Sequence, residues 1–245
     1  MATIASPAAR LRTDRLFYTG VGLAIFVTVF WGFAQSFYLA RWLTAPPTTP
    51  EIGPLLAIHA AAFTAWTALM VIQPLLIATR NVPIHRMFGA FGAGVAAAMV
   101  VLGNLAGIAA MHVGFRGLGD PLVFYAVPFF SINSFAVVVL LAILHRNRAE
   151  THKRLILLAN VALLGAAIAR IPLAPLQAGA PFTFIFLPNL ITVAGIVHDL
   201  RTRGRIHKVW LIGGPAMLAS QLVMMAVMGT GPWHAFAGTM AALWR

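Results

Sequence analysis

Residues 121–145 read PLVFYAVPFFSINSFAVVVLLAILH and contain no Asp, Glu, Lys or Arg. A helix of this length can cross the ~30 Å hydrocarbon core of a bilayer, which takes about 20 residues. Six more apolar stretches of comparable length occur at residues 17–40, 54–78, 87–112, 155–176, 181–199 and 209–229. The sequence therefore predicts an all-α polytopic membrane protein, with a seven-transmembrane-helix bundle over residues 17–229. Residues 1–16 are expected to form an N-terminal segment, and residues 230–245 a C-terminal tail.

Basic residues are distributed unevenly between the segments that connect these stretches. Every second segment is basic, and together these hold thirteen of the seventeen Lys and Arg residues: Arg10, Arg12, Arg15, Arg80, Arg86, Arg146, Arg148, Lys153, Arg154, Arg201, Arg203, Arg205 and Lys208. The remaining four are Arg41, Arg116, Arg170 and Arg245. Because cytoplasmic loops of membrane proteins are rich in Lys and Arg, the pattern predicts a cytoplasmic N-terminus and a C-terminus outside.

The composition of the chain agrees with a membrane location. Apolar residues make up 60% of the 245 residues, and charged residues 9%. A net charge of +12 would suggest nucleic-acid binding in a soluble protein, but here the basic residues lie at helix ends beside anionic headgroups. We therefore expect the lipid bilayer as a partner, and no nucleic acid. The absence of cysteine excludes disulfides, thiolate metal sites, iron–sulfur clusters and c-type haem attachment.

One predicted helix, over residues 54–78, carries His59, Trp66 and Gln73 at seven-residue intervals. At about 100° per residue, these positions drift by only ~20° per step, so they share one face of the helix. Polar residues are costly in lipid, and such a face is expected to contact protein or a cofactor.

Arg170 is the most costly residue to place, because the predicted helix over residues 155–176 contains no acid near it. One interpretation is that its side chain extends to the outer headgroups. The other is that it holds an anion, such as Asp120, a haem propionate or an anionic substrate.

The eight histidines fall into two layers near the ends of the predicted helices. Imidazole is a good ligand for haem iron, zinc and copper, and one haem needs only one or two histidines. Two such layers would suit a two-haem electron-transfer protein. The haem-ligand candidates are His59 with His112 in the outer layer, and His85, His145, His152 and His198 in the inner layer.

Other residues complete the predicted cofactor site. Trp66, Gln73 and Arg170 are expected to contact the cofactor, and His85, His152 and His207 are the candidates for binding a metal ion. The alternative is that interfacial histidines only contact lipid headgroups.

Motifs for other chemistries are absent from the sequence. It contains no nucleophile elbow, phosphate-binding loop or dinucleotide-binding glycine motif, and it leaves open whether the chain is an enzyme. Gly103 and Gly107 form a GxxxG motif, which indicates helix packing more often than phosphate binding. The only lysines, Lys153 and Lys208, lie at the predicted cytoplasmic edge, which excludes a retinal Schiff base in the last helix.

Several short motifs resemble those of uncharacterised bacterial multi-helix membrane proteins. They are His59 with Gln73, IHRMFG at residues 84–89, ETHKRL at 150–155 and AIAR at 167–170. The chain is similar in these motifs to the DUF2306-type and DUF420-type proteins, the latter linked to cytochrome oxidase assembly. More remotely, it resembles the cytochrome b561 superfamily, which binds haem through paired histidines.

The resemblance covers residues 55–175 best and implies a multi-pass protein of the bacterial inner (cytoplasmic) membrane. It also implies a haem- or quinone-related role and carries functional roles to His59, His85, His152 and Arg170. The chain departs from the b561 pattern in having seven helices and no clear four-histidine arrangement on central helices.

Three functional hypotheses follow from the sequence. The first is a protein that binds b-type haem or a metal through histidines in respiratory electron transfer or oxidase assembly, with a respiratory complex or quinone as partner. The second is a small transporter or sensor in which His59, Trp66, Gln73 and Arg170 line a polar cavity. The third is a structural or assembly subunit whose basic rim docks onto a larger membrane complex.

Overall fold

The computed structural model describes residues 7–44, 53–113 and 119–244, so Arg116 and Arg245 lie outside the described residues. The helices are α1 (Pro7–Gly32), α2 (Pro54–Ala78), α3 (Val82–Val113), α4 (Pro121–Phe124), α5 (Ala126–Leu144), α6 (Ala149–Ile168), α7 (Ala174–Ala178), α8 (Phe182–Phe186), α9 (Leu190–Arg203), α10 (Gly214–Val227) and α11 (Gly231–Ala242). Short π-helical and 3₁₀-helical segments occur at Ala34–Tyr38, Leu187–Asn189 and Val209–Gly213.

Seven segments within the described ranges are long and apolar enough to cross a membrane. They are Arg10–Gly32, Pro54–Ala78, Val82–Val113, Pro121–Leu144, Ala149–Ile168, Phe182–Arg203 and Val209–Val227. The same ranges contain no strand. The prediction of an all-helical, multi-pass membrane protein with seven membrane-length segments is therefore confirmed for the described residues.

Several helices begin earlier than hydropathy predicts. The first begins at Pro7 instead of residue 17, and α6 begins at Ala149 instead of residue 155. The added turns carry Arg and Lys, which are good helix formers although they are polar, so hydropathy places these starts too late. The predicted segment 1–16 is thus partly helical, and the predicted tail 230–245 contains α11.

The helix predicted over residues 155–176 ends early, at Ile168, and Arg170 follows it. Pro172 explains this end, because proline has no N–H to donate and disfavours a helical conformation in the residue before it. The prediction that the helix continues beyond Arg170 was wrong.

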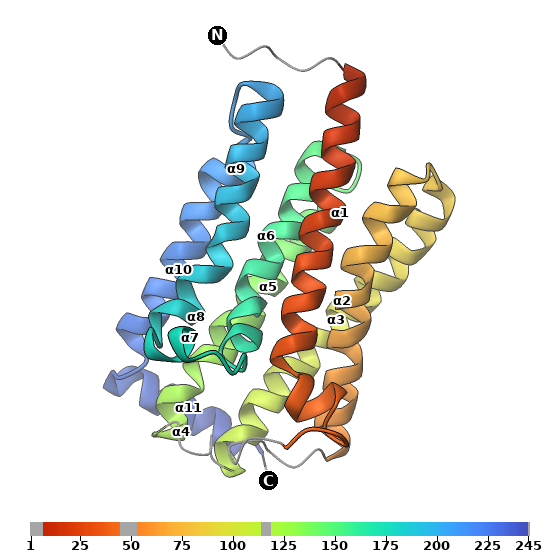
Figure 1. Cartoon of the computed structure of the whole chain (residues 1–245). Helices are drawn as coiled ribbons and strands as arrows, with labels where there is room; N and C mark the ends of the chain where they lie inside the picture. The colour runs from red at the N-terminus through yellow and green to blue at the C-terminus, as the bar shows by residue number, and fades with distance from the viewer. Residues whose placement is uncertain (1–6, 45–52, 114–118, 245) are drawn as a thin grey trace.

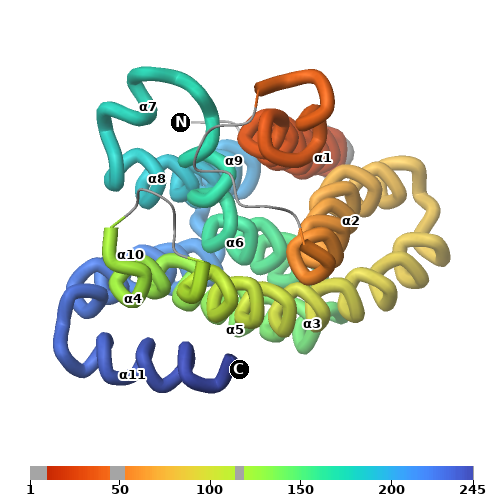
Figure 2. The backbone as a smooth tube through the Cα atoms, turned by 90° about the horizontal axis from the view of Figure 1, so that it is seen from below, coloured from red at the N-terminus to blue at the C-terminus, as the bar shows by residue number. Residues whose placement is uncertain are grey.

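The bundle is built from antiparallel neighbours, α2 with α3 and α5 with α6, and α1 packs against α2 and α6. Figure 1 shows that the α2–α3, α5–α6 and α9–α10 turns lie at the same end as the start of α1. The thirteen basic residues of the alternating segments lie in these turns and the adjoining helix ends, and we call this the basic end. At the opposite end, α11 packs against α4 and α3 (Figure 2).

Two glycines allow α1 to approach its neighbours closely. A Cβ added at Gly22 would overlap the main-chain carbonyl of Met70 on α2, and one added at Gly32 would overlap that of Ala167 on α6. The GxxxG residues play a similar part between α3 and α5, since an added Cβ at Gly103 would press against Ile132. These contacts support the interpretation of the GxxxG motif as a packing feature.

The main apolar core runs between α1, α2, α3, α5, α6 and the start of the last span. Its large buried side chains include Trp66, Met99, Phe135, Leu158 and Trp210. A second, smaller core around Trp233 and Tyr125 attaches α11 to the end opposite the basic one.

Candidate functional site

A cluster of charged side chains is buried between α1, α6 and α9 at the basic end. At its centre are Arg154 on α6 and Asp199 on α9, whose side chains are both 0% exposed. The guanidinium donates to both carboxylate oxygens, and the Nε–Oδ2 distance is 3.0 Å. Its third nitrogen, Nη1, donates to the Glu150 carboxylate at 2.8 Å and to the Glu150 main-chain oxygen at 2.6 Å. This complete pairing offsets the cost of burying the two charges.

Asp14 on α1 completes the cluster. Its carboxylate accepts hydrogen bonds from Lys153 Nζ (2.8 Å), His198 Nε2 (2.7 Å) and Arg203 Nη2 (2.8 Å). The His198 ring is buried and stacks on Phe17, with 4.1 Å between the ring centres. These contacts join the first helix to two helices that lie far along the chain.

The charge cluster is electrically balanced when His198 is neutral. It contains three acids and three bases, namely Asp14, Glu150, Asp199, Lys153, Arg154 and Arg203. From the sequence, its basic members are predicted only as part of the cytoplasmic rim, and the cluster itself is not predicted. A signal was present: the chain has only five acids, and an acid within a membrane span needs a partner.

His85 and His152, both predicted ligands, lie at the basic end. They come from the first turns of α3 and α6. His152 Nδ1 lies 2.8 Å from the Ala142 main-chain oxygen. The Gln73 amide is oriented so that both its nitrogen and its oxygen form hydrogen bonds. Its Nε2 donates to His85 Nδ1 (2.6 Å), and its oxygen accepts from the Gly89 N–H (2.9 Å).

The remaining inner histidines are engaged elsewhere. His198 Nε2 is bonded within the charge cluster. His145 Nδ1 bonds to the Leu141 carbonyl of its own helix (2.9 Å), and His207 Nδ1 accepts from the Val209 N–H (3.2 Å). Burial lowers the pKa of His207, which keeps that ring neutral.

The predicted metal site is not assembled. Within the described ranges, no group of three or more His, Asp or Glu side chains is arranged to hold a metal ion. His85, His152 and His207 therefore do not form a common set of ligands, because His207 lies beside the charge cluster instead.

The predicted polar face of α2 does contact protein, but at separate places. Trp66 is buried and donates from Nε1 to Asn160 Oδ1 on α6 (3.1 Å), while Gln73 contacts α3. His59 stacks on Phe63 and lies against the main chain of Leu102 on α3. The face therefore does not line one continuous polar cavity.

The outer haem pair is not brought together. His59 lies beside Leu102, whereas His112 is ten residues farther along α3 (102 to 112), or about 15 Å at 1.5 Å per residue. His112 Nε2 instead donates to the Ala241 carbonyl on α11 (2.9 Å). Two histidines so far apart do not share one haem iron.

Arg170 has no carboxylate partner among the described residues. Its Nη1 donates to the Ala166 carbonyl (2.7 Å), and its guanidinium lies 4.9 Å from the centre of the Phe33 ring. Asp120, one of its predicted partners, pairs with His234 instead (3.0 Å). On α2, His59 Nδ1 is buried without a partner.

The fold defines a multi-pass helical membrane protein. No protein-family model, curated protein or solved structure matches the chain. The resemblance to the DUF2306-type, DUF420-type and cytochrome b561 proteins therefore stays a prediction from the short motifs.

Proposed function

We propose that this protein lies in a bacterial inner membrane and binds b-type haem at the basic end, where His85 on α3 and His152 on α6 would hold the iron. In this proposal the N-terminus faces the cytoplasm, so the haem lies toward the cytoplasmic surface. The sequence motifs at residues 84–89 and 150–155, which carry the family resemblance, each contain one of the two histidines.

The observation that carries the proposal is that His85 and His152 lie in the first turns of two different helices, which begin at the same end of the bundle (Figure 1). Because a carbonyl only accepts, the contact with Ala142 places the proton of His152 on Nδ1 and leaves a lone pair on Nε2. Metal-ligating histidines usually donate their other ring N–H to a carbonyl in this way. The other inner candidates, His145 and His198, are held by their own helix and by the charge cluster.

Gln73 holds the His85 ring by donating from Nε2 to His85 Nδ1. A histidine that binds iron through Nε2 carries its proton on Nδ1, which then needs an acceptor. Iron binding through His85 Nε2 would therefore require this hydrogen bond to be replaced by one to an acceptor. Haem would supply one-electron redox chemistry, and the chain would hold and orient the rings.

We propose one haem, at the basic end, and none at the outer histidines His59 and His112. His59 on α2 lies beside Leu102 of α3, and His112 is about 15 Å farther along α3 by helix rise. Arg170 follows His152 by eighteen residues (152 to 170), which corresponds to about 27 Å, so it cannot anchor a propionate of haem at His152. A quinone or respiratory complex as redox partner stays a prediction from the resemblance.

The test is the haem content of the purified protein after expression with haem supplied. We expect His85→Ala and His152→Ala each to lose most of the haem that the wild type retains. His145→Ala is the matched control, because it removes a histidine from the same end whose contact is within its own helix. Equal haem content in all four proteins, or a colourless wild type, would rule out this axial pair.

A separate observation favours a second function, a transporter or sensor for a small anion. His59 Nδ1 is buried and unpaired, and Arg170 has no carboxylate partner in the described part of the chain. A carboxylate ligand would satisfy both groups. Acetate binding to the purified protein that disappears in Arg170→Ala would support this candidate, and a wild type without such binding would reject it.

A further inference from the structure

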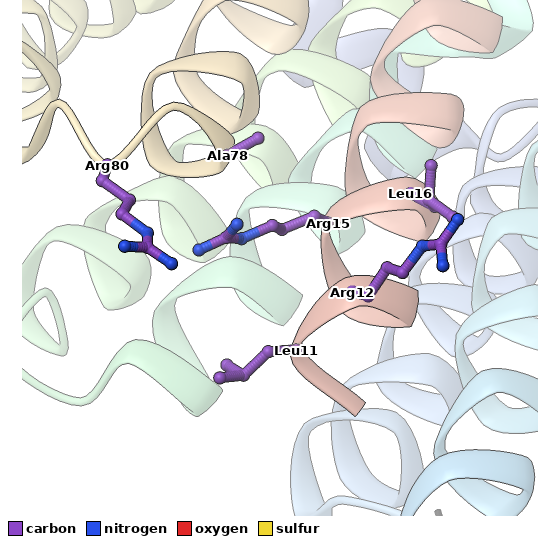
Figure 3. Close-up of a pocket in the computed structure, with 6 residues that line it drawn as sticks. All are labelled: Leu11, Arg12, Arg15, Leu16, Ala78 and Arg80. Atoms are coloured by element: carbon purple, nitrogen blue, oxygen red, sulfur yellow. The ribbon is translucent and has the colours of Figure 1, made fainter. Parts of the chain in front are cut away.

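A hollow at the basic end lies between the start of α1 and the turn after α2. It is lined by Leu11, Arg12, Arg15, Leu16, Ala78 and Arg80 (Figure 3). The three arginines contribute only donors, and no acid lies among the six residues. The hollow is separate from both the charge cluster and the histidine pair.

Two of these arginines face each other across the hollow. Figure 3 shows the guanidinium groups of Arg15 and Arg80 pointing toward one another, while that of Arg12 turns toward Leu16. Neither Arg15 nor Arg80 forms an ion pair with a described residue. Like charges repel, so an anion between the two groups would stabilise this arrangement.

The balance of charges in the hollow differs from that in the neighbouring charge cluster. On one side of α1, Asp14 is surrounded by Lys153 and Arg203, so cations and anions are matched. On the side that faces α2, the cations are left without anions. An anion from outside the described chain would balance this positive charge.

The main chain fixes Arg80 in place. Its φ angle of 62° lies in the left-handed region, which residues other than glycine rarely adopt. Its N–H donates to the Ile77 carbonyl (3.1 Å), and the following Asn81 N–H donates to the Leu76 carbonyl (2.8 Å). This tight turn holds the Arg80 side chain at the edge of the hollow.

We propose that this hollow binds the phosphate of an anionic phospholipid. The phosphate would lie between Arg15 and Arg80, because the planar guanidinium matches two phosphate oxygens at once. Leu11 and Leu16, which are 58% and 66% exposed, offer apolar surface beside it for the start of the acyl chains. A soluble phosphate would make no use of these leucines, so the site favours a lipid headgroup.

The test is a titration of the full-length, detergent-purified protein with phosphatidylglycerol, followed by native mass spectrometry. Phosphatidylcholine serves as the zwitterionic reference and inorganic phosphate as the soluble one. We expect Arg15→Gln with Arg80→Gln to weaken phosphatidylglycerol binding on the order of tenfold, since each basic residue contributes to the attraction. If the double variant does not fold, Arg80→Gln alone is measured for a smaller loss in the same direction.

The matched control is Arg146→Gln with Arg148→Gln. It removes two exposed arginines from the same end of the bundle but leaves the hollow intact. The control should bind phosphatidylglycerol as the wild type does. An equal loss in the control, or no loss in Arg15→Gln with Arg80→Gln, would overturn the site. Binding of inorganic phosphate without preference for phosphatidylglycerol over phosphatidylcholine would overturn its assignment to lipid.

Discussion

Among single residues, Arg154 is expected to matter most for stability. Its side chain is fully buried and bonded to Asp199 and Glu150, so every donor that faces the interior is used for the fold. Removing one member of such a pair leaves a buried charge without compensation. The same argument explains why these charges are tolerated between membrane helices.

Arg154→Met is predicted to lower the free energy of unfolding by about 3–5 kcal/mol, because it removes the bidentate partner of the buried Asp199 carboxylate and leaves it only Arg203 Nε (3.4 Å) and the His207 N–H (3.1 Å). Thermal unfolding of the variant in detergent measures this loss. Arg148→Met is the control, since Arg148 is exposed and makes no ion pair in the described ranges, and it should change stability by about 0.5 kcal/mol or less. Equal effects of the two substitutions would contradict the role assigned to the buried pair.

Among the helices, α1 depends on close contact of main chains. Gly22 faces the carbonyl of Met70, whereas Gly20, two residues earlier, has no atom within 4 Å of a built Cβ. Gly22→Val is therefore predicted to destabilise the bundle by about 1–3 kcal/mol through overpacking. Gly20→Val should leave the melting temperature nearly unchanged. If both valines had the same effect, helix propensity and not packing would explain the result.

The attachment of α11 is predicted to depend on pH. His234 donates from Nδ1 to the Thr230 carbonyl (3.0 Å) and from Nε2 to Asp120 (3.0 Å), which requires a protonated ring. These bonds raise the pKa of His234 above its ordinary value of 6.5. The Leu122 N–H and His234 lower the pKa of Asp120 below 3.8.

The pair is thus complete between those two pKa values. Its contribution is lost as pH rises through the raised pKa of His234, and also as pH falls through the lowered pKa of Asp120. Hydrogen exchange in α11, corrected for intrinsic rates, should become faster between about pH 6 and pH 9. His234→Gln should remove this dependence, and a wild type with constant protection would show that the pair does not hold α11.

For the whole molecule, topology can be tested with single cysteines because the chain contains none. Asn147→Cys lies in the α5–α6 turn at the basic end, and Thr239→Cys lies on α11 at the opposite end. With the N-terminus in the cytoplasm, a membrane-impermeant maleimide should label only the Thr239→Cys protein in intact spheroplasts. Labelling of only the Asn147→Cys protein would reverse the proposed orientation.

The seven membrane-length segments could be predicted because a helix that crosses a bilayer needs a certain length and an apolar composition. Each segment shows both properties in its own residues, without reference to the rest of the chain. The sequence prediction missed the early starts of α1 and α6, where the helix continues through polar residues, and the end of α6 before Pro172. These features depend on helix propensity and proline geometry, which hydropathy does not measure.

The candidate site was less predictable because its contacts join distant parts of the chain. Asp14 and His198 are 184 residues apart, and no local pattern pairs them. The positions of the histidines in the sequence do not distinguish His152 from His198. In the structure, the His152 ring is held by the Ala142 carbonyl, whereas His198 belongs to the charge cluster. The choice of His85 and His152 among the six predicted haem ligands is a proposal that rests on these tertiary contacts.

The central claim, haem bound by His85 and His152, is tested most directly by the absorption spectrum of the purified wild-type protein. The spectrum is recorded air-oxidised and again after reduction with dithionite. The account predicts a Soret band and an α band that sharpens on reduction, as for b-type haem with two histidine ligands. A protein expressed with haem supplied that shows neither band would contradict the claim and leave the anion site at Arg170 as the function to test.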